Sequence, residues 1–156
     1  MTKFLTPIIF IIISQAAGII GSIFTSPAIP GWYASLNKPS FNPPGWVFGP
    51  VWIILYTMMG LAAWLVWQKW GESGLAKTAV ILFFIHLVFN TLWSFLFFGL
   101  QNPLLAFIEI IILWAMILAL IILYYQLDKR AAYLMIPYLL WVSFAALLNF
   151  SIWRLN

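Results

Sequence analysis

The stretch PLLAFIEIIILWAMILALIILYYQ, residues 103–126, decides the fold class, because it is long and almost wholly apolar and carries one charge, on Glu109. A helix needs about 20 apolar residues to cross the hydrocarbon core of a bilayer. Four further stretches resemble it, so the sequence predicts five membrane-spanning helices near Phe4–Thr25, Trp46–Gln68, Thr78–Leu100, Pro103–Gln126 and Ala131–Trp153. The strand-like alternation of a barrel is missing, and helices satisfy their own backbone in lipid.

Composition supports one membrane domain spanning residues 1–156. The chain is 65% hydrophobic and 6% charged, far from the composition of a soluble domain. Most connections between the predicted helices are short, which makes successive helices antiparallel neighbours. The expected fold is therefore an all-α, compact antiparallel bundle of five transmembrane helices, whose environment is the lipid bilayer.

The few charges predict an orientation. The net charge is +4, and positive residues gather in loops on the cytoplasmic side of membrane proteins. Five basic residues fall on the side of the N-terminus and two on the other, which places the N-terminus in the cytoplasm and the C-terminus outside: Lys3, Lys69, Lys77, Lys129 and Arg130 against Lys38 and Arg154. No basic cluster indicates a nucleic-acid partner.

The first connection, residues 26–45, is long and rich in proline and aromatic residues. Proline restricts its own backbone and that of the residue before it, so this segment is expected to be stiff and partly extended. A long ordered loop in a small protein is usually functional, and often a lid. We therefore expect residues 26–45 to cover a ligand site.

Aromatic and amide side chains recur at helical spacing in the half of the bundle near that loop. Three series step by three or four residues along one helix face: Phe48, Trp52 and Tyr56; His86, Asn90, Trp93 and Phe97; Trp141, Ala145 and Asn149. Aromatic walls with a few amides suit a flat, mostly apolar ligand. By spacing alone, a packed bundle core is the favoured interpretation, because such series usually belong to the core.

Three further features keep two interpretations each. Glu109 is either a polar anchor or proton carrier, or a carboxyl satisfied by a neighbouring helix. His86 is either a haem ligand or a hydrogen-bonded core histidine, and the second is favoured because no second metal ligand accompanies it. The small residues Ser14, Gly18 and Ser22 either pack within the bundle or mediate a dimer. No metal site is predicted, and no hydrolytic triad or phosphate loop is present.

Several motifs resemble those of the TspO/MBR family, the tryptophan-rich sensory proteins and translocator proteins. The first and longest begins at Trp32-Tyr33 and continues through Pro43-Pro44 and Trp46-Val47-Phe48-Gly49-Pro50 to Trp52 and Tyr56. The third helix contributes Asn90, Trp93 and Phe97-Phe98-Gly99, and the fifth Pro137-Tyr138, Trp141, Phe144-Ala145 and Leu148-Asn149. The resemblance covers all five predicted helices.

The resemblance implies a receptor, often a homodimer, that binds porphyrins, haem, sterols and synthetic aromatic compounds beneath the first loop. Carried over by motif, the ligand-lining positions are Trp52, Asn90, Trp93, Trp141, Ala145 and Asn149, with Trp32 and Tyr33 in the lid. It also implies that Trp52 and Trp141 are the catalytic pair if the protein degrades porphyrin in light. The acidic residue of the fourth helix has counterparts in the family, which favours a ligand-site role for Glu109.

Two departures from the family pattern concern the lid and the ligand. Phe41 stands where a second loop tryptophan is usual, so weaker stacking in the lid is expected. The stretch 147–154 lacks the tyrosine of the mammalian cholesterol motif. A tetrapyrrole in a bacterial cell membrane is therefore favoured over cholesterol, with no cofactor required. The favoured function is a binding or sensory protein; a light-dependent porphyrin-degrading catalyst and a porphyrin or sterol transporter are the alternatives.

Overall fold

The computed structural model describes residues 2–156, with side chains from Leu5 onward. Across that range it contains no strand and five long helices: α1 (Thr2–Ala28), α2 (Phe48–Trp67), α3 (Gly74–Ser94), α4 (Pro103–Leu127) and α5 (Lys129–Leu155). Each is long and apolar enough, with its flanking turns, to cross a membrane. The predicted all-α bundle of five spans is confirmed.

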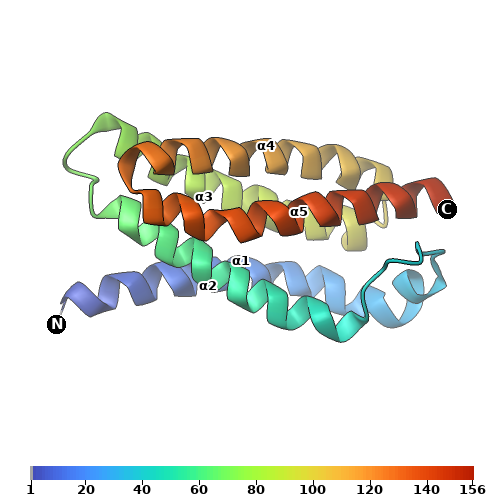
Figure 1. Cartoon of the computed structure of the whole chain (residues 1–156). Helices are drawn as coiled ribbons and strands as arrows, with labels where there is room; N and C mark the ends of the chain where they lie inside the picture. The colour runs from blue at the N-terminus through green and yellow to red at the C-terminus, as the bar shows by residue number, and fades with distance from the viewer. Residues whose placement is uncertain (1) are drawn as a thin grey trace.

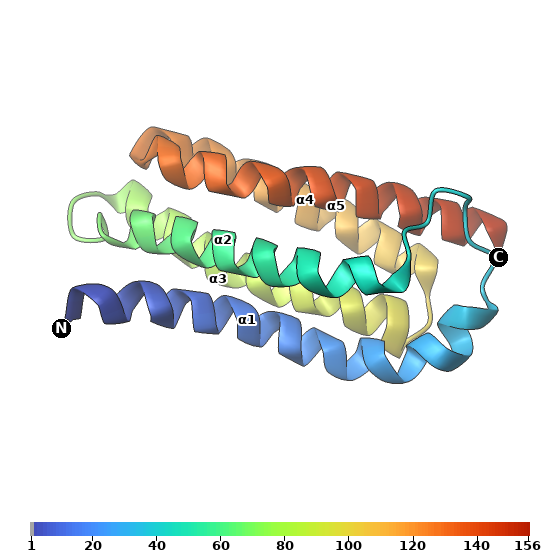
Figure 2. The same cartoon turned by 60° about the horizontal axis from the view of Figure 1, so that its bottom comes forward.

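The helices lie antiparallel, and the two termini lie at opposite ends of the bundle (Figure 1). α1 packs against α2 and α3, α2 also packs against α5, and α4 contacts both α3 and α5. The circuit around the bundle is therefore α1, α2, α5, α4, α3. In Figure 2, α1 runs along the edge farthest from α4 and α5.

The α2–α3 and α4–α5 connections lie at one end of the bundle, and residues 36–44 lie at the other (Figure 1). We call the first end the closed end and the half of the bundle next to it the closed half. The other half is the cavity half.

The first connection differs from the predicted lid. α1 continues past Thr25 to Ala28, and a π-helical turn, Ile29–Tyr33, follows it directly. The irregular part is residues 36–44, and a short 3-10 turn, Gly45–Val47, leads into α2. Pro27 and Pro30 have no backbone N–H and cannot donate the hydrogen bonds of an α-helix. The wider π-helical turn tolerates these missing donors, so the chain stays helical at both prolines.

The other helix ends lie close to their predicted positions, and a side-chain cap explains the earlier start of α3. α3 begins at Gly74 rather than Thr78, because the Ser73 hydroxyl accepts a hydrogen bond from the Ala76 backbone N–H at 3.1 Å. α4 ends one residue later than predicted, at Leu127. α3 also ends differently, in a second π-helical turn, Phe95–Gly99.

Glycines bring α1 close to its neighbours. A methyl group on Gly60 would lie 2.7 Å from the Cα of Ile11, and one on Gly18 would lie 2.4 Å from the Tyr56 ring. Gly21 faces the Ser94 hydroxyl, where the same methyl would lie at 3.0 Å. The small residues of the first helix thus serve packing within the bundle at Gly18 and Gly21, whereas Ser22 is exposed.

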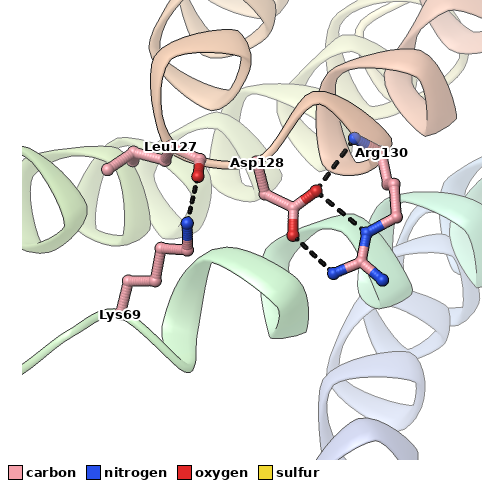
Figure 3. A network of polar contacts seen from close by, with 4 residues as sticks. All are labelled: Lys69, Leu127, Asp128 and Arg130. Carbon is pink, nitrogen blue, oxygen red and sulfur yellow. Dashed lines mark hydrogen bonds and ion pairs between the residues drawn. The ribbon is translucent and has the colours of Figure 1, made fainter.

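Polar contacts at the closed end join the helix connections (Figure 3). The Asp128 carboxylate caps α5 by accepting from the Arg130 backbone N–H at 2.9 Å, and it pairs with the Arg130 guanidinium at 2.8 Å. The Lys69 ammonium donates to the Leu127 carbonyl. The hydrogen bond from the Arg130 side chain holds the pKa of Asp128 below its ordinary value. These contacts explain why α5 begins at Lys129, earlier than the predicted Ala131.

Candidate ligand-binding cavity

A cavity of about 490 Å³ occupies the cavity half of the bundle. All five helices contribute to its wall, from Gln15 on α1 to Asn149 on α5, and the first connection closes its end with Tyr33, Asn42 and Pro43. Its volume lies within the range of about 300–1,000 Å³ that is usual for small-molecule sites. The helices therefore leave a partly open space between them that is large enough for an organic ligand.

Aromatic rings from α2, α3 and α5 form a large part of the wall. The Trp52 ring stacks on Tyr56 with 5.4 Å between centroids, and α3 carries a similar stack of Trp93 on Phe97 at 5.1 Å. Phe48 on α2 and Trp141 on α5 pack edge to face, with 5.9 Å between centroids. Rings in these arrangements stabilise one another and present flat apolar faces.

One wall of the cavity continues into a chain of buried hydrogen bonds. The Tyr56 hydroxyl donates to the Asn90 Oδ1 atom at 2.5 Å, and the Asn90 Nδ2 atom donates to the Tyr138 hydroxyl at 2.8 Å. Tyr138 and the His86 Nε2 atom lie 2.8 Å apart. The chain joins α2, α3 and α5, and both Tyr138 and His86 have an exposed fraction of 0%.

A second asparagine is held just as firmly. The Trp93 indole N–H donates to the Asn149 Oδ1 atom at 3.0 Å, and the Asn149 Nδ2 atom donates to the Pro103 carbonyl at 2.7 Å. The Pro103 carbonyl belongs to the first turn of α4. Asn149 thus ties α3, α4 and α5 together beside the cavity.

The first connection is held by contacts within itself and by hydrogen bonds to Asn156. The Tyr33 hydroxyl donates to the Asn42 side chain at 3.3 Å, and the Lys38 ammonium lies 4.6 Å from the centre of the Tyr33 ring. Asn37 and Asn156 exchange two hydrogen bonds, both at 2.9 Å, between the backbone of one and the side chain of the other. The first connection is therefore attached to the residue that follows α5.

The structure brings most of the predicted site residues together. Ten of the thirteen line the cavity: Tyr33, Phe48, Trp52, Tyr56, Asn90, Trp93, Phe97, Trp141, Ala145 and Asn149. The remaining three, Trp32, His86 and Glu109, do not line it. Trp32 packs against Phe97 and Phe98 and borders a separate hollow of about 370 Å³ beside the α3–α4 connection.

His86 and Glu109 are buried among the helices. His86 is a hydrogen-bonded core histidine, as the favoured interpretation held, with Phe83 and Tyr138 as its partners. Glu109 is 4% exposed, and neither of its carboxylate oxygens has a hydrogen-bond partner. Among residues 2–156, no three histidine and acidic side chains gather as a metal site would require.

Sequence reasoning missed the contribution of α1 and of Tyr138. Gln15, Gly18 and Thr25 line the cavity, and the Gln15 amide donates to the Ile53 carbonyl at 2.9 Å. The polar residues at positions 15 and 25 were the available signal, since polar groups within a span usually face the bundle interior. Tyr138 was visible as part of a motif, but nothing in its spacing reveals its bond to Asn90.

Comparison with known proteins places the chain among named relatives. The sequence model described as the TspO/MBR family matches residues 10–154. The chain is 44% identical over 144 residues to the "Tryptophan-rich protein TspO" of Archaeoglobus fulgidus, covering 90% of each chain. It is 38% identical over 140 residues to the "Translocator protein" of Homo sapiens, covering 88% of this chain and 82% of the relative. With the "Tryptophan-rich sensory protein" of Cereibacter sphaeroides, identity is 41% over 125 residues, covering 80% and 77%.

Proposed function

The chain belongs to the TspO/MBR family, a family of multi-pass integral membrane proteins, and on that premise we propose that it is a receptor for tetrapyrroles. Its relatives carry the names of sensory and translocator proteins, which supports a receptor- or transporter-type role in the membrane. The ligand is protoporphyrin, haem or a similarly flat apolar molecule. It lies in the cavity beneath the first connection.

The cavity itself carries this proposal. Its wall is mostly aromatic and apolar, and a few polar groups face inward from fixed positions. The Trp141 indole N–H is buried and has no hydrogen-bond partner. An unpaired buried donor costs about 1–3 kcal/mol, so a ligand that accepts a hydrogen bond from Trp141 recovers part of that cost.

A titration of tryptophan fluorescence with protoporphyrin tests the proposal. We expect saturable quenching, because three tryptophans, Trp52, Trp93 and Trp141, line the cavity. Asn90→Leu should weaken binding by about fivefold, the value of one ordinary hydrogen bond. If both Asn90→Leu and Trp52→Phe leave the titration unchanged, the ligand does not occupy this cavity.

Degradation of porphyrin in light is the second candidate function. Trp52 and Trp141 both line the cavity, so a single bound porphyrin can contact both indoles. In this candidate function the excited porphyrin takes one electron from an indole, and dissolved dioxygen is the terminal oxidant that completes its breakdown. Product formed in light and in darkness, compared for the parent and for Trp141→Phe, separates a catalyst from a simple receptor. An unaltered pigment under illumination would remove the catalytic candidate.

Transport across the membrane is favoured by the names of some relatives. Uptake of protoporphyrin into proteoliposomes, compared with protein-free vesicles, tests it. The transport candidate fails if both kinds of vesicle take up porphyrin at the same rate.

The proposed setting is a bacterial cell membrane, with the N-terminus in the cytoplasm and a homodimer as the assembly. Basic residues support this orientation, since Lys69, Lys77, Lys129 and Arg130 lie at the closed end. Lys3 lies in the part of α1 whose side chains are not described. The orientation is tested with single cysteines placed at Gly71, in the α2–α3 connection, and at Asn102, before α4, which are labelled from outside intact cells. Labelling at Asn102 alone is expected, and labelling at Gly71 alone would reverse the orientation.

A further inference from the structure

We propose that His86 and Tyr138 are positioning residues that hold the Asn90 side-chain amide in one orientation toward the ligand. The proposal rests on the proposed function, because it concerns how the same cavity recognises its ligand. Neither His86 nor Tyr138 lines the cavity, whereas Asn90 does. Both would therefore act on a ligand indirectly, and their hydrogen bonds reach the cavity through Asn90. The Tyr138 ring also packs against Trp52, and Tyr138→Phe keeps that ring.

In the series of hydrogen bonds from His86 to Tyr56, the protonation of His86 decides which group donates and which accepts in each bond. The His86 Nδ1 atom lies 3.2 Å from the Phe83 carbonyl oxygen, which can only accept, so Nδ1 carries the proton. A fully buried imidazole without an acidic hydrogen-bond partner is neutral, which leaves Nε2 as an acceptor. The Tyr138 hydroxyl must therefore donate its proton to His86.

This direction then sets the amide. Because the Tyr138 proton points at His86, the Tyr138 oxygen presents lone pairs to Asn90, and the Asn90 NH₂ group must face it. The Asn90 oxygen is left to accept from the Tyr56 hydroxyl. A flipped amide would place its oxygen against the Tyr138 oxygen, with no proton between them. His86 thus blocks the flip although Phe83 and Tyr138, not Asn90, are its hydrogen-bond partners.

The consequence for a ligand is a fixed pattern of polar groups. Asn90 uses one N–H and one lone pair within the chain, so one of each remains for the cavity. The Tyr56 hydroxyl donates its proton to Asn90, so it can act only as a hydrogen-bond acceptor toward the cavity. Without the His86 acceptor, the Tyr138 proton is free to turn toward Asn90, and both amide orientations become available.

The experiment measures protoporphyrin affinity by fluorescence quenching in the parent and in the Asn90→Leu background. In the parent, His86→Leu and Tyr138→Phe should each weaken binding by about fivefold, because the amide is no longer held. In Asn90→Leu the same substitutions should change nothing further, since residues that act through Asn90 are not additive with it. His86→Gln should restore the parental affinity, because its side-chain oxygen can accept from Tyr138.

The chain offers a matched control for Tyr138→Phe. Tyr124 is also fully buried, but its hydroxyl has no hydrogen-bond partner and it does not line the cavity. Tyr124→Phe removes the same atom and should leave the affinity as it is. If Tyr124→Phe weakens binding as much as Tyr138→Phe, the effect is one of general packing and the proposal falls.

A ligand-free measurement separates this proposal from the proposed function. The sequence has a single histidine, so ¹⁵N-labelled histidine gives one imidazole signal pair. We expect a protonated Nδ1 and an unprotonated, hydrogen-bonded Nε2, with the Nε2 signal moving in Tyr138→Phe and staying in Tyr124→Phe. A protonated Nε2 would overturn the proposal even if protoporphyrin binds.

The binding arms decide the remaining outcomes. If protoporphyrin binds and His86→Leu weakens it equally in both backgrounds, His86 does not act through Asn90. If protoporphyrin does not bind at all, the proposed function fails, and the hydrogen-bonded series from Tyr56 to His86 has no role in recognising it. The imidazole signals then still report the hydrogen bonds of His86. Should His86→Leu fail to fold, the isosteric Tyr138→Phe carries the test.

Discussion

The two halves of the bundle are built from the same helices and differ in how tightly those helices meet. In the closed half, small and aliphatic side chains fill most of the interior, beside the fully buried ring of Tyr124. Their exposed fraction is 0–1%: Met59, Ala62, Ala63, Val66, Ala76, Ala79, Val80, Ile117, Leu120, Ala131, Ala132 and Met135. In the cavity half, large aromatic side chains stand along the same faces and enclose about 490 Å³.

The difference teaches that side-chain size decides where this bundle opens. Alanines let helix backbones approach closely in lipid, where apolar burial alone provides little attraction between helices. Tryptophan and tyrosine instead hold helices apart, and hydrogen bonds such as that from Trp93 to Asn149 hold them at that distance. The closed half therefore supplies the packing against which the cavity half stays open.

The largest expected effect comes from adding one methyl group to α2. Gly60→Ala should destabilise the protein by about 3 kcal/mol, because the new methyl meets the Ile11 backbone, which cannot turn away. Gly49→Ala, on the same helix in the cavity half, meets nothing within 4 Å and should change stability by less than about 0.5 kcal/mol. Thermal unfolding in detergent micelles measures both. Equal losses would show that the halves are packed alike.

The next effect concerns buried hydroxyls. Tyr138→Phe should destabilise the protein by about 2 kcal/mol, because it leaves the Asn90 Nδ2 atom and the His86 Nε2 atom without their partner, the Tyr138 hydroxyl. Tyr124→Phe removes a hydroxyl that already lacks a partner and should be neutral or stabilising. The same unfolding measurement applies. A loss in Tyr124→Phe would mean that its hydroxyl has a partner such as bound water.

Enlarging one alanine in each half separates ligand binding from packing. Ala145→Leu extends into the cavity and should weaken protoporphyrin binding by about tenfold with little change in stability, since space is available there. Ala132→Leu lies in the closed half, where the side chain is 1% exposed, and should lower stability instead. Quenching titrations and thermal unfolding are run on both variants. The contrast fails if Ala145→Leu binds like the parent.

The smallest effect is a pH dependence at the closed end. The pKa of Asp128 is held below its ordinary value by the Arg130 side chain, so its stabilisation is complete above about pH 4 and is lost as pH falls through the lowered pKa. Asp128→Ala should cost about 1 kcal/mol at pH 7 and less at pH 3. Ser73→Ala removes an uncharged cap from α3 and should cost a similar amount at both pH values. A pH-independent cost for Asp128→Ala would contradict the assigned cap.

Most of the fold was predictable because the bilayer imposes it. Five apolar stretches of sufficient length predict five helices, and short connections predict their antiparallel order. The extension of α1 to Ala28 was not predictable, because Pro27 and Pro30 read as signals of extended chain. Local propensity gives no sign that a π turn will accommodate them.

The candidate site was predictable where periodicity places large side chains on one face. Trp52, Asn90 and Trp141 follow helical spacing and line the cavity. His86 follows the same spacing as Asn90 but does not reach the cavity, and the Tyr138 hydroxyl joins the two side chains. Trp32 lies outside the cavity wall. Spacing reports the face of a helix, and it does not report the distance from that face to a neighbour.

The sequence alone determined that this protein is a five-span membrane bundle with an aromatic half and an aliphatic half, because length, hydropathy and side-chain size are local properties. The tertiary structure decided which side chains meet. The bonds from Tyr56 to Asn90 and onward to Tyr138 and His86 join residues far apart in the chain. A hydrogen bond requires two atoms about 3 Å apart, and that proximity exists once α2, α3 and α5 have packed together.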